Sequence, residues 1–227
     1  MKYYKLEIES ENNINEICNC TFFKQIGKFW IYEITEDETT GYVDFFIEFI
    51  KRNKEKLEMN GITSDDISVW LLYEYDRQCL FCISAKNMKL LSEENIVLCF
   101  SCWEKDSTLD LSYDNSYLDE EKILYLLKIK TDKNPNDFFS IKNFRFDNGW
   151  WCYQTDNVRS GICELISLIK KNRKHIFSNG ISLKDVNICF HYEYLTECSW
   201  EFSPEEMKEL GNLGLDLSVK CQKTNCN

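Results

Sequence analysis

Four cysteines in the first half of the chain have a spacing that is able to bind metal. Cys79 and Cys82 form one Cys-x-x-Cys pair, and Cys99 and Cys102 form a second pair sixteen residues later. This spacing is a recognised zinc pattern, and four thiolates can hold Zn²⁺ tetrahedrally. One interpretation of the sequence is therefore a zinc-binding or thiol-redox module built from these four residues.

Two features oppose that interpretation. Cys99 and Cys102 fall in a predicted strand, where side chains three residues apart point to opposite faces of a sheet. The chain also contains an internal repeat, in which the equivalent positions of the second half hold Cys198, Glu201, Ser218 and Cys221. Only the outer pair therefore has a cysteine in both halves. The alternative interpretation is buried structural thiols, because unpaired cysteine behaves as a small apolar residue.

A second candidate site is acidic. Glu33, Glu36, Asp37 and Glu38 lie in and just after a predicted strand of the first half. The chain has a formal net charge of −11, and residues 1–110 carry 21 acidic and 12 basic residues against 17 and 15 in residues 111–227. Acidic clusters steer basic proteins toward an interface and form contact pairs with them. We therefore expect these four residues to bind a basic partner, with a solvated loop as the alternative.

Other chemistry is poorly represented. The chain has two histidines, and it contains no G-x-S-x-G nucleophile motif and no G-x-G-x-x-G phosphate loop. Glu74 and Glu193, each between two tyrosines, offer a third hypothesis of a small hydrolase or transferase, but no acid–base partner accompanies them. The acidic balance disfavours direct nucleic-acid binding. We expect a protein that is not an enzyme and needs no cofactor, with zinc as the alternative.

The internal repeat determines how these residues are positioned. A shift of 119 aligns residues 51–102 with residues 170–221 without a gap. A shift of 121 extends the match upstream and pairs Tyr4 with Tyr125 and Trp30 with Trp151. The sequence therefore predicts two homologous modules, residues 1–108 and 119–227, joined by a linker at residues 109–118. We expect each module to fold around its own core.

Both modules predict the same order of elements. In the first, alternating apolar residues indicate strands at residues 3–8, 29–34, 67–75, 81–83 and 96–103. Helical periodicity indicates helices at about 42–59 and 85–94, the first ended by Gly61. The order β-β-α-β-β-α-β contains a ferredoxin-like βαββαβ with one added strand. The predicted fold class is α+β, with two tandem antiparallel-rich sheets, each covered by two helices.

The second module carries sharper local signals. Ser203, Pro204 and Glu206 occupy the N-cap, first and third positions of a predicted helix, and Gly211 and Gly214 are expected to end it. With the aromatic strand at residues 149–153 and the helix-to-strand segment at residues 203–217, this module resembles the bacterial family known as domain of unknown function 4279. The resemblance covers most of the second module and, more loosely, the first. It implies a shared fold but no established activity, and similar small domains often look like immunity proteins encoded beside toxins.

These observations define the expected function. No apolar stretch of signal-peptide length opens the chain and no apolar run spans a bilayer, so we expect a cytoplasmic protein with reduced thiols and no membrane contact. We expect a non-catalytic, immunity-type or inhibitor protein that masks a basic partner, such as a toxin or nuclease, through its acidic first module. The zinc or thiol-redox module is the alternative.

Overall fold

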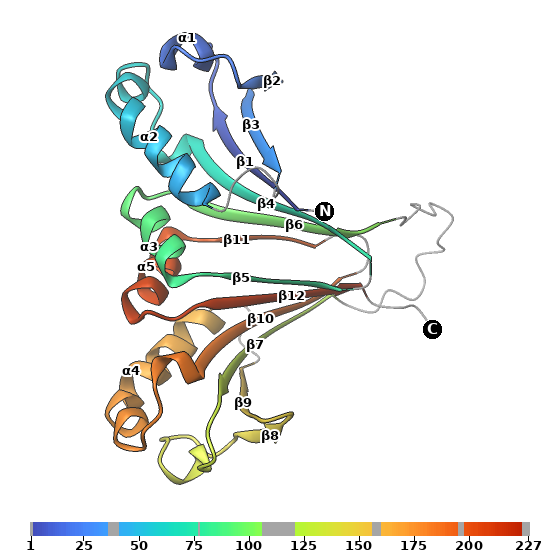
Figure 1. Ribbon diagram of the computed structural model, residues 1–227, viewed down its shortest axis with the longest axis vertical. Coiled ribbons are helices and arrows are strands. Elements are labelled where there is room, and N and C mark those ends of the chain that lie inside the picture. Colours follow the sequence, from blue (N-terminus) through green and yellow to red (C-terminus); the bar gives the residue numbers. More distant parts are fainter. Residues whose placement is uncertain are drawn as a thin grey trace.

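The chain folds as an α+β protein with two mixed β-sheets (Figure 1). The computed structural model describes residues 2–35, 41–76, 78–105, 121–155, 160–194 and 198–223. Within these ranges the α-helices are α1 (Ile14–Cys18), α2 (Tyr42–Met59), α3 (Ala85–Glu93), α4 (Gly161–Ser178) and α5 (Pro204–Leu213). Short 3-10 turns occupy Ser64–Asp66, Pro135–Asp137 and Leu183–Asp185. No helix in the described ranges has the length and apolar character needed to cross a membrane.

Each sheet has six strands within the part of the chain that the structure describes. The first sheet contains, in spatial order, β11 (Cys198–Phe202), β6 (Val97–Glu104), β4 (Ile67–Tyr75), β1 (Lys2–Glu9), β3 (Phe29–Thr35) and β2 (Lys24–Ile26). The second contains β5 (Cys79–Ile83), β12 (Leu217–Lys223), β10 (Val186–Tyr194), β7 (Lys122–Ile129), β9 (Trp150–Thr155) and β8 (Arg145–Asp147). The pairs β4–β6 and β10–β12 are parallel, and the other pairs are antiparallel.

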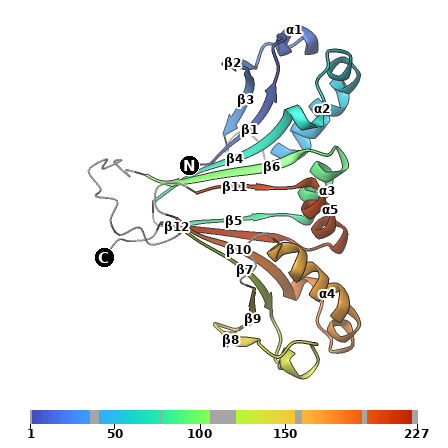
Figure 2. The ribbon, with the colours of Figure 1, turned by 180° about the vertical axis from the view of Figure 1, so that it is seen from behind.

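The two halves of the chain exchange one strand. Strand β5, from the first half, pairs with β12 at the edge of the second sheet, and β11, from the second half, pairs with β6 at the edge of the first sheet. Figures 1 and 2 show these two strands along the middle of the molecule, between the sheets that they complete. The expectation that each module folds around its own core is therefore wrong, because each sheet needs a strand from the other half.

The strand registers repeat between the halves. Lys5 lies opposite Glu33 in the first sheet, and Leu126 lies opposite Gln154 at the same place in the second. Equivalent residues also pair in the exchanged strands, since Cys198 lies opposite Cys102 and Cys79 lies opposite Cys221. The first sheet maps onto the second under the sequence shifts of 121 and 119. An approximate twofold axis therefore passes between β5 and β11.

Local signals in the sequence set the helix limits. Helix α2 spans the residues that the apolar periodicity predicts, and Gly61 follows it with a φ of 77°, a conformation that costs glycine little. Helix α5 begins with the predicted capping box, in which Ser203 Oγ accepts from the Glu206 amide and the Glu206 carboxylate accepts from the Ser203 amide. Gly214 ends α5 in the left-handed conformation, as predicted, whereas Gly211, which the sequence also predicts at the end of the helix, lies inside it.

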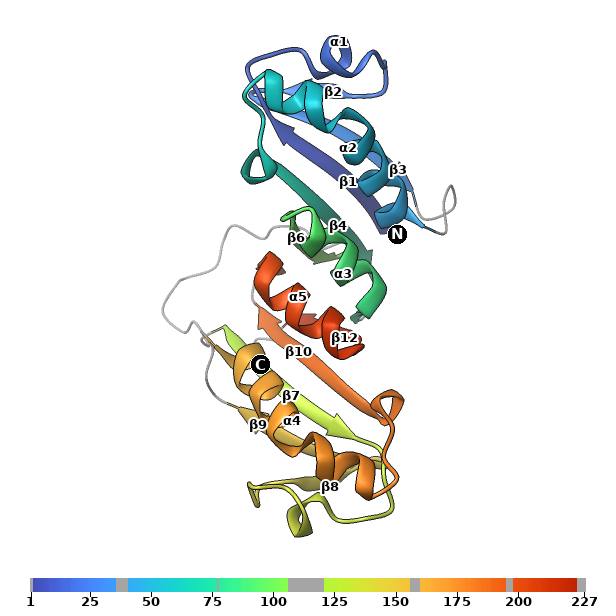
Figure 3. The same cartoon turned by 90° about the vertical axis from the view of Figure 1, so that its left-hand side faces the viewer.

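The four longer helices cover one side of the two sheets. Figure 3 shows them side by side in the order α2, α3, α5 and α4, with the strands behind them. Helices α3 and α5 pack closely at the twofold axis, where a Cβ atom on Gly211 would lie 3.0 Å from the Lys89 Cβ and 3.1 Å from the Ala85 carbonyl oxygen. The glycine thus permits the close approach of the two helices.

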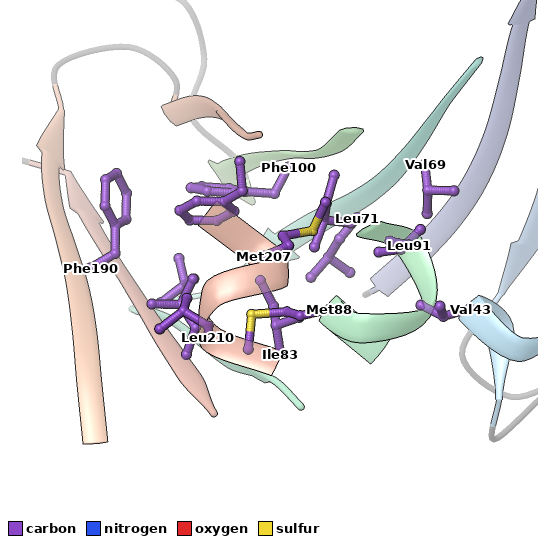
Figure 4. Close-up of a cluster of buried hydrophobic side chains, with 14 of the residues drawn as sticks. Val43, Val69, Leu71, Ile83, Met88, Leu91, Phe100, Phe190, Met207 and Leu210 are labelled. Carbon is purple, nitrogen blue, oxygen red and sulfur yellow. The ribbon is translucent and has the colours of Figure 1, made fainter. Parts of the chain in front are cut away.

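One continuous apolar core joins the halves. Met88 and Met207, from α3 and α5, lie among buried side chains of both sheets (Figure 4). Phe100 on β6 is fully buried, and its ring centroid lies 5.9 Å from that of Phe190 on β10 and 5.7 Å from that of Phe202 on β11. The inner faces of the two sheets therefore meet at the axis, and the two halves form one packed unit.

Candidate functional site

The four cysteines of the zinc-like spacing do not come together. Along β5, Cys79 is fully buried whereas Cys82 is exposed, because the side chains of a strand alternate between its faces. Along β6, Cys102 points to the inner face and Cys99 to the opposite one, where its Sγ atom lies 3.9 Å from a carboxylate oxygen of Glu201. The structure therefore brings Cys79 and Cys102 together and places Cys82 and Cys99 elsewhere.

A different set of four cysteines gathers at the twofold axis. Cys79, Cys102, Cys198 and Cys221 are each 0% exposed, and we call them the axial thiol cluster. The Sγ atoms of Cys79 and Cys102 are 2.9 Å apart, and those of Cys198 and Cys221 are 3.0 Å apart. The Sγ atoms of Cys79, Cys102 and Cys221 all lie within 4.8 Å of one another. The cluster thus joins two close pairs of thiols that the twofold axis relates.

The strand exchange builds this cluster. Cys198 is held beside Cys102 within the first sheet, and Cys79 is held beside Cys221 within the second. The close sulfur–sulfur contacts run between the sheets, from Cys79 to Cys102 and from Cys198 to Cys221. Sequence reasoning missed the two second-half cysteines as site residues. The signal that could have found them is the repeat itself, which keeps cysteine at these two positions in both halves.

Contact and burial keep the Cys79 and Cys198 thiols of the axial thiol cluster protonated. A hydrogen bond with Cys102, together with burial, raises the pKa of Cys79 well above its ordinary value, although contact with Cys221 opposes this. The same two causes raise the pKa of Cys198. Neutral buried thiols are poor nucleophiles. The cluster can therefore pack as plain thiols, form disulfides on oxidation, or lose protons to a bound soft cation, but it does not suit nucleophilic catalysis.

Each sheet also has an outer face, turned away from the helices. The outer face of the first sheet includes Lys5, Glu7, Glu33, Trp70, Ser101 and Glu201. In the same order, the corresponding positions on the outer face of the second sheet hold Leu126, Lys128, Gln154, Cys189, Lys220 and Cys82. Charge changes at most of these positions. Glu7 corresponds to Lys128, Glu33 to Gln154 and Ser101 to Lys220, so the first outer face is acidic and the second is basic.

The predicted acidic residues are only partly placed. Glu33 lies on the outer face of the first sheet, on β3, and is exposed. Glu36, Asp37 and Glu38 lie outside the described residues. Glu7, nearby, is 14% exposed and forms an ion pair with Lys5 at 2.8 Å. The Lys5 ammonium also lies 4.6 Å from the ring centre of Trp70, so an indole with a fixed cation occupies the middle of the acidic outer face.

The basic outer face is hollowed. A cavity of about 520 Å³ lies over the second sheet, and its lining includes Trp150, Lys128, Lys220 and Asn187. His191 lies on the same face, and burial, followed by the charge of Lys220, lowers its pKa. Glu193 is on this face and Glu74 on the outer face of the other sheet, so the two carboxylates of the hydrolase hypothesis do not share a site.

The chain was compared with known proteins. No protein-family model matches it, and neither a curated protein nor a solved structure matches it.

Proposed function

We propose that this chain is a non-catalytic binding protein, of the immunity or inhibitor type, that masks a basic protein partner with the outer face of its first sheet. The observation that supports this is the change of charge between two outer faces built on the same strand pairing. Lysine at residue 128 and glutamine at residue 154 occupy the positions of Glu7 and Glu33. Because the strand pairing accommodates either charge, the acidic residues are free to serve recognition.

The composition of the acidic outer face suits a protein partner. Glu33 and Glu201 are exposed, and they lie on strands on either side of the central Trp70. A large aromatic side chain surrounded by charges is typical of the residues that dominate binding energy at protein interfaces. Net negative charge at the rim attracts a basic partner and accelerates association at low salt. A toxin or nuclease with a basic surface is a partner of this chemistry.

A binding experiment with matched charge variants tests the proposal. The partner is isolated on the immobilised chain from the source organism, identified and purified, and its dissociation constant is measured at several salt concentrations. We expect a basic partner whose affinity falls as salt rises. The variant Glu33→Lys/Glu201→Lys should weaken binding at least tenfold, about 1.4 kcal/mol, because it reverses two exposed charges of the face.

The control reverses a charge on the outer face of the other sheet. Lys220→Glu changes the basic outer face of the second sheet and should leave the dissociation constant unchanged. The proposal fails if the partner is not basic, if salt has no effect on affinity, or if Lys220→Glu weakens binding as much as the double variant does.

We further propose that the two halves derive from one duplicated unit with the element order of a ferredoxin-like βαββαβ and one added strand, related to domain of unknown function 4279 and working in the cytoplasm. The matching registers of the two sheets support the duplication. A chain with a single copy of this unit should form a twofold dimer that exchanges the strand equivalent to β5 and β11. A folded monomer of such a chain would contradict this origin of the exchange.

A further inference from the structure

We infer that the axial thiol cluster is a structural zinc site, in which Cys79, Cys102, Cys198 and Cys221 hold one Zn²⁺ between the two sheets. This inference is independent of the proposed partner. It differs from the site that the Cys-x-x-Cys spacing predicts, because two of the four ligands come from the second half of the chain.

The donor set favours zinc. Four thiolates without a carboxylate or imidazole are soft ligands, which select zinc, copper(I) or iron–sulfur clusters over magnesium or calcium. A single ion that completes four-coordination with four cysteines, and leaves no open position, is typical of structural zinc. The full burial of the four side chains leaves little room for anything larger than one ion.

The distances fit one small ion. Zinc–sulfur bonds of about 2.3 Å in a tetrahedron place the sulfur atoms about 3.8 Å apart. The close pairs, at 2.9 and 3.0 Å, would separate by about 1 Å, and the group of Cys79, Cys102 and Cys221 already lies within 4.8 Å. Cys198 lies outside that group of three and touches it through Cys221, so its side chain must rotate toward the other sulfur atoms to seat the ion.

The repeat supplies an independent argument. Elsewhere the halves do not keep their cysteines, since Cys82 corresponds to Glu201 and Cys99 corresponds to Ser218. At the axis, cysteine is kept at both positions in both halves. A metal on a twofold axis requires ligands from both copies, whereas a packing role would tolerate any small apolar residue at these positions.

The ion would link the exchanged strands. Each sheet supplies two ligands, Cys102 and Cys198 from the first and Cys79 and Cys221 from the second. Binding replaces the thiol protons by the metal, so no electron transfer is needed and the released protons pass to solvent. Because the unfolded chain lacks the site, the free energy of metal binding adds to the free energy of unfolding.

Metal analysis of the intact chain tests the inference. Protein purified under reducing conditions with zinc should contain one zinc ion per chain by elemental analysis. Cobalt(II) put in its place should show the intense thiolate charge-transfer absorption of a tetrahedral sulfur site. Chelator treatment should lower the temperature of unfolding, and added zinc should restore it.

Matched cysteine variants locate the ion. Cys198→Ser and Cys221→Ser should abolish stoichiometric zinc and the cobalt spectrum, whereas Cys82→Ser and Cys99→Ser should leave both unchanged. If the axial variants fail to fold, the cobalt spectrum of the wild-type chain still decides the number of thiolates. The inference is overturned if the purified protein contains no zinc and all of its thiols react with a thiol reagent once it is denatured. It is also overturned if disulfides are found in protein purified under reducing conditions, or if Cys82→Ser loses the metal.

Discussion

The axis and the outer faces of this molecule have diverged to very different extents. At the axis, the same cysteine pair occurs in both halves and the exchanged strands meet in the same register. On the outer faces, residues at equivalent positions differ in charge, as Glu7 and Lys128 do. A side chain at the axis packs against both halves at once, so a change there disturbs two sheets. A side chain on an outer face contacts one sheet and solvent, and it can change without affecting the other half.

The largest expected effect lies at the axis. Phe100→Ala should lower the free energy of unfolding by about 3–5 kcal/mol, because it removes a fully buried ring that contacts aromatic side chains of both sheets. Chemical denaturation followed by tryptophan fluorescence measures the change. The matched control is Phe146→Ala, which removes a ring that is 61% exposed and should cost far less. Equal losses for the two variants would mean that the axis is not the common core.

The two halves differ in how a tyrosine of the first strand packs against the start of the long helix. In the first half Tyr42 stacks on Tyr4, with ring centroids 3.5 Å apart, whereas in the second half Gly161 leaves room for Tyr125. A Cβ atom on Gly161 would lie 2.1 Å from that ring. We expect Gly161→Ala to lower the free energy of unfolding by about 1–3 kcal/mol, because the ring must move within a packed core.

Two further variants sharpen this test by thermal unfolding. Gly41→Ala, beside α2, should have little effect, since its nearest contact would be 3.5 Å away. Gly161→Ala combined with Tyr125→Leu should recover part of the loss. A Gly161→Ala variant as stable as the wild type would show that the ring at position 125 has room to relax.

The sequence predicts the helices and strands of this fold better than it predicts which strands pair with each other. Periodicity and glycine position are local properties, and they locate α2 and α5 to within a residue or two. The exchange of β5 and β11 is not a local property. The two strands are copies of each other, so either one could pair with the edge strand of either sheet. The alternation in β5 correctly separates Cys79 from Cys82, but it cannot reveal that Cys221 is the neighbour of Cys79.

The outer face of the second sheet should be the more sensitive to acid. Burial and the charge of Lys220, with Lys128 and Lys122 on β7, lower the pKa of His191, while Glu193 opposes them. The unfolded chain therefore binds a proton more readily than the folded one, and the free energy of unfolding should fall as pH drops below about 6.5. The variant His191→Leu carries at position 191 the residue that the first half has at the equivalent position, Leu72. It should reduce the slope of the free energy of unfolding against pH between pH 7 and pH 5. Identical slopes for variant and wild type would contradict the assignment.

The smallest effect on stability is expected at the acidic outer face. Glu33→Lys should change the free energy of unfolding by no more than about 0.5 kcal/mol, because the side chain is exposed at the surface of one sheet. The measurement is a denaturation curve beside that of the wild type. A loss of several kcal/mol would show that this position is part of the packed structure and would remove it from the set of residues free to diverge.

The claim that the halves form one interlocked unit is tested most directly by cutting the chain between them. A protease site is introduced between residues 105 and 121, the folded protein is cleaved, and the product is run on a native gel-filtration column. The exchange of β5 and β11 predicts that both fragments elute together at the volume of the uncut chain. Elution as two separate folded fragments would show that each half is complete by itself, and would contradict the interlocking of the two sheets.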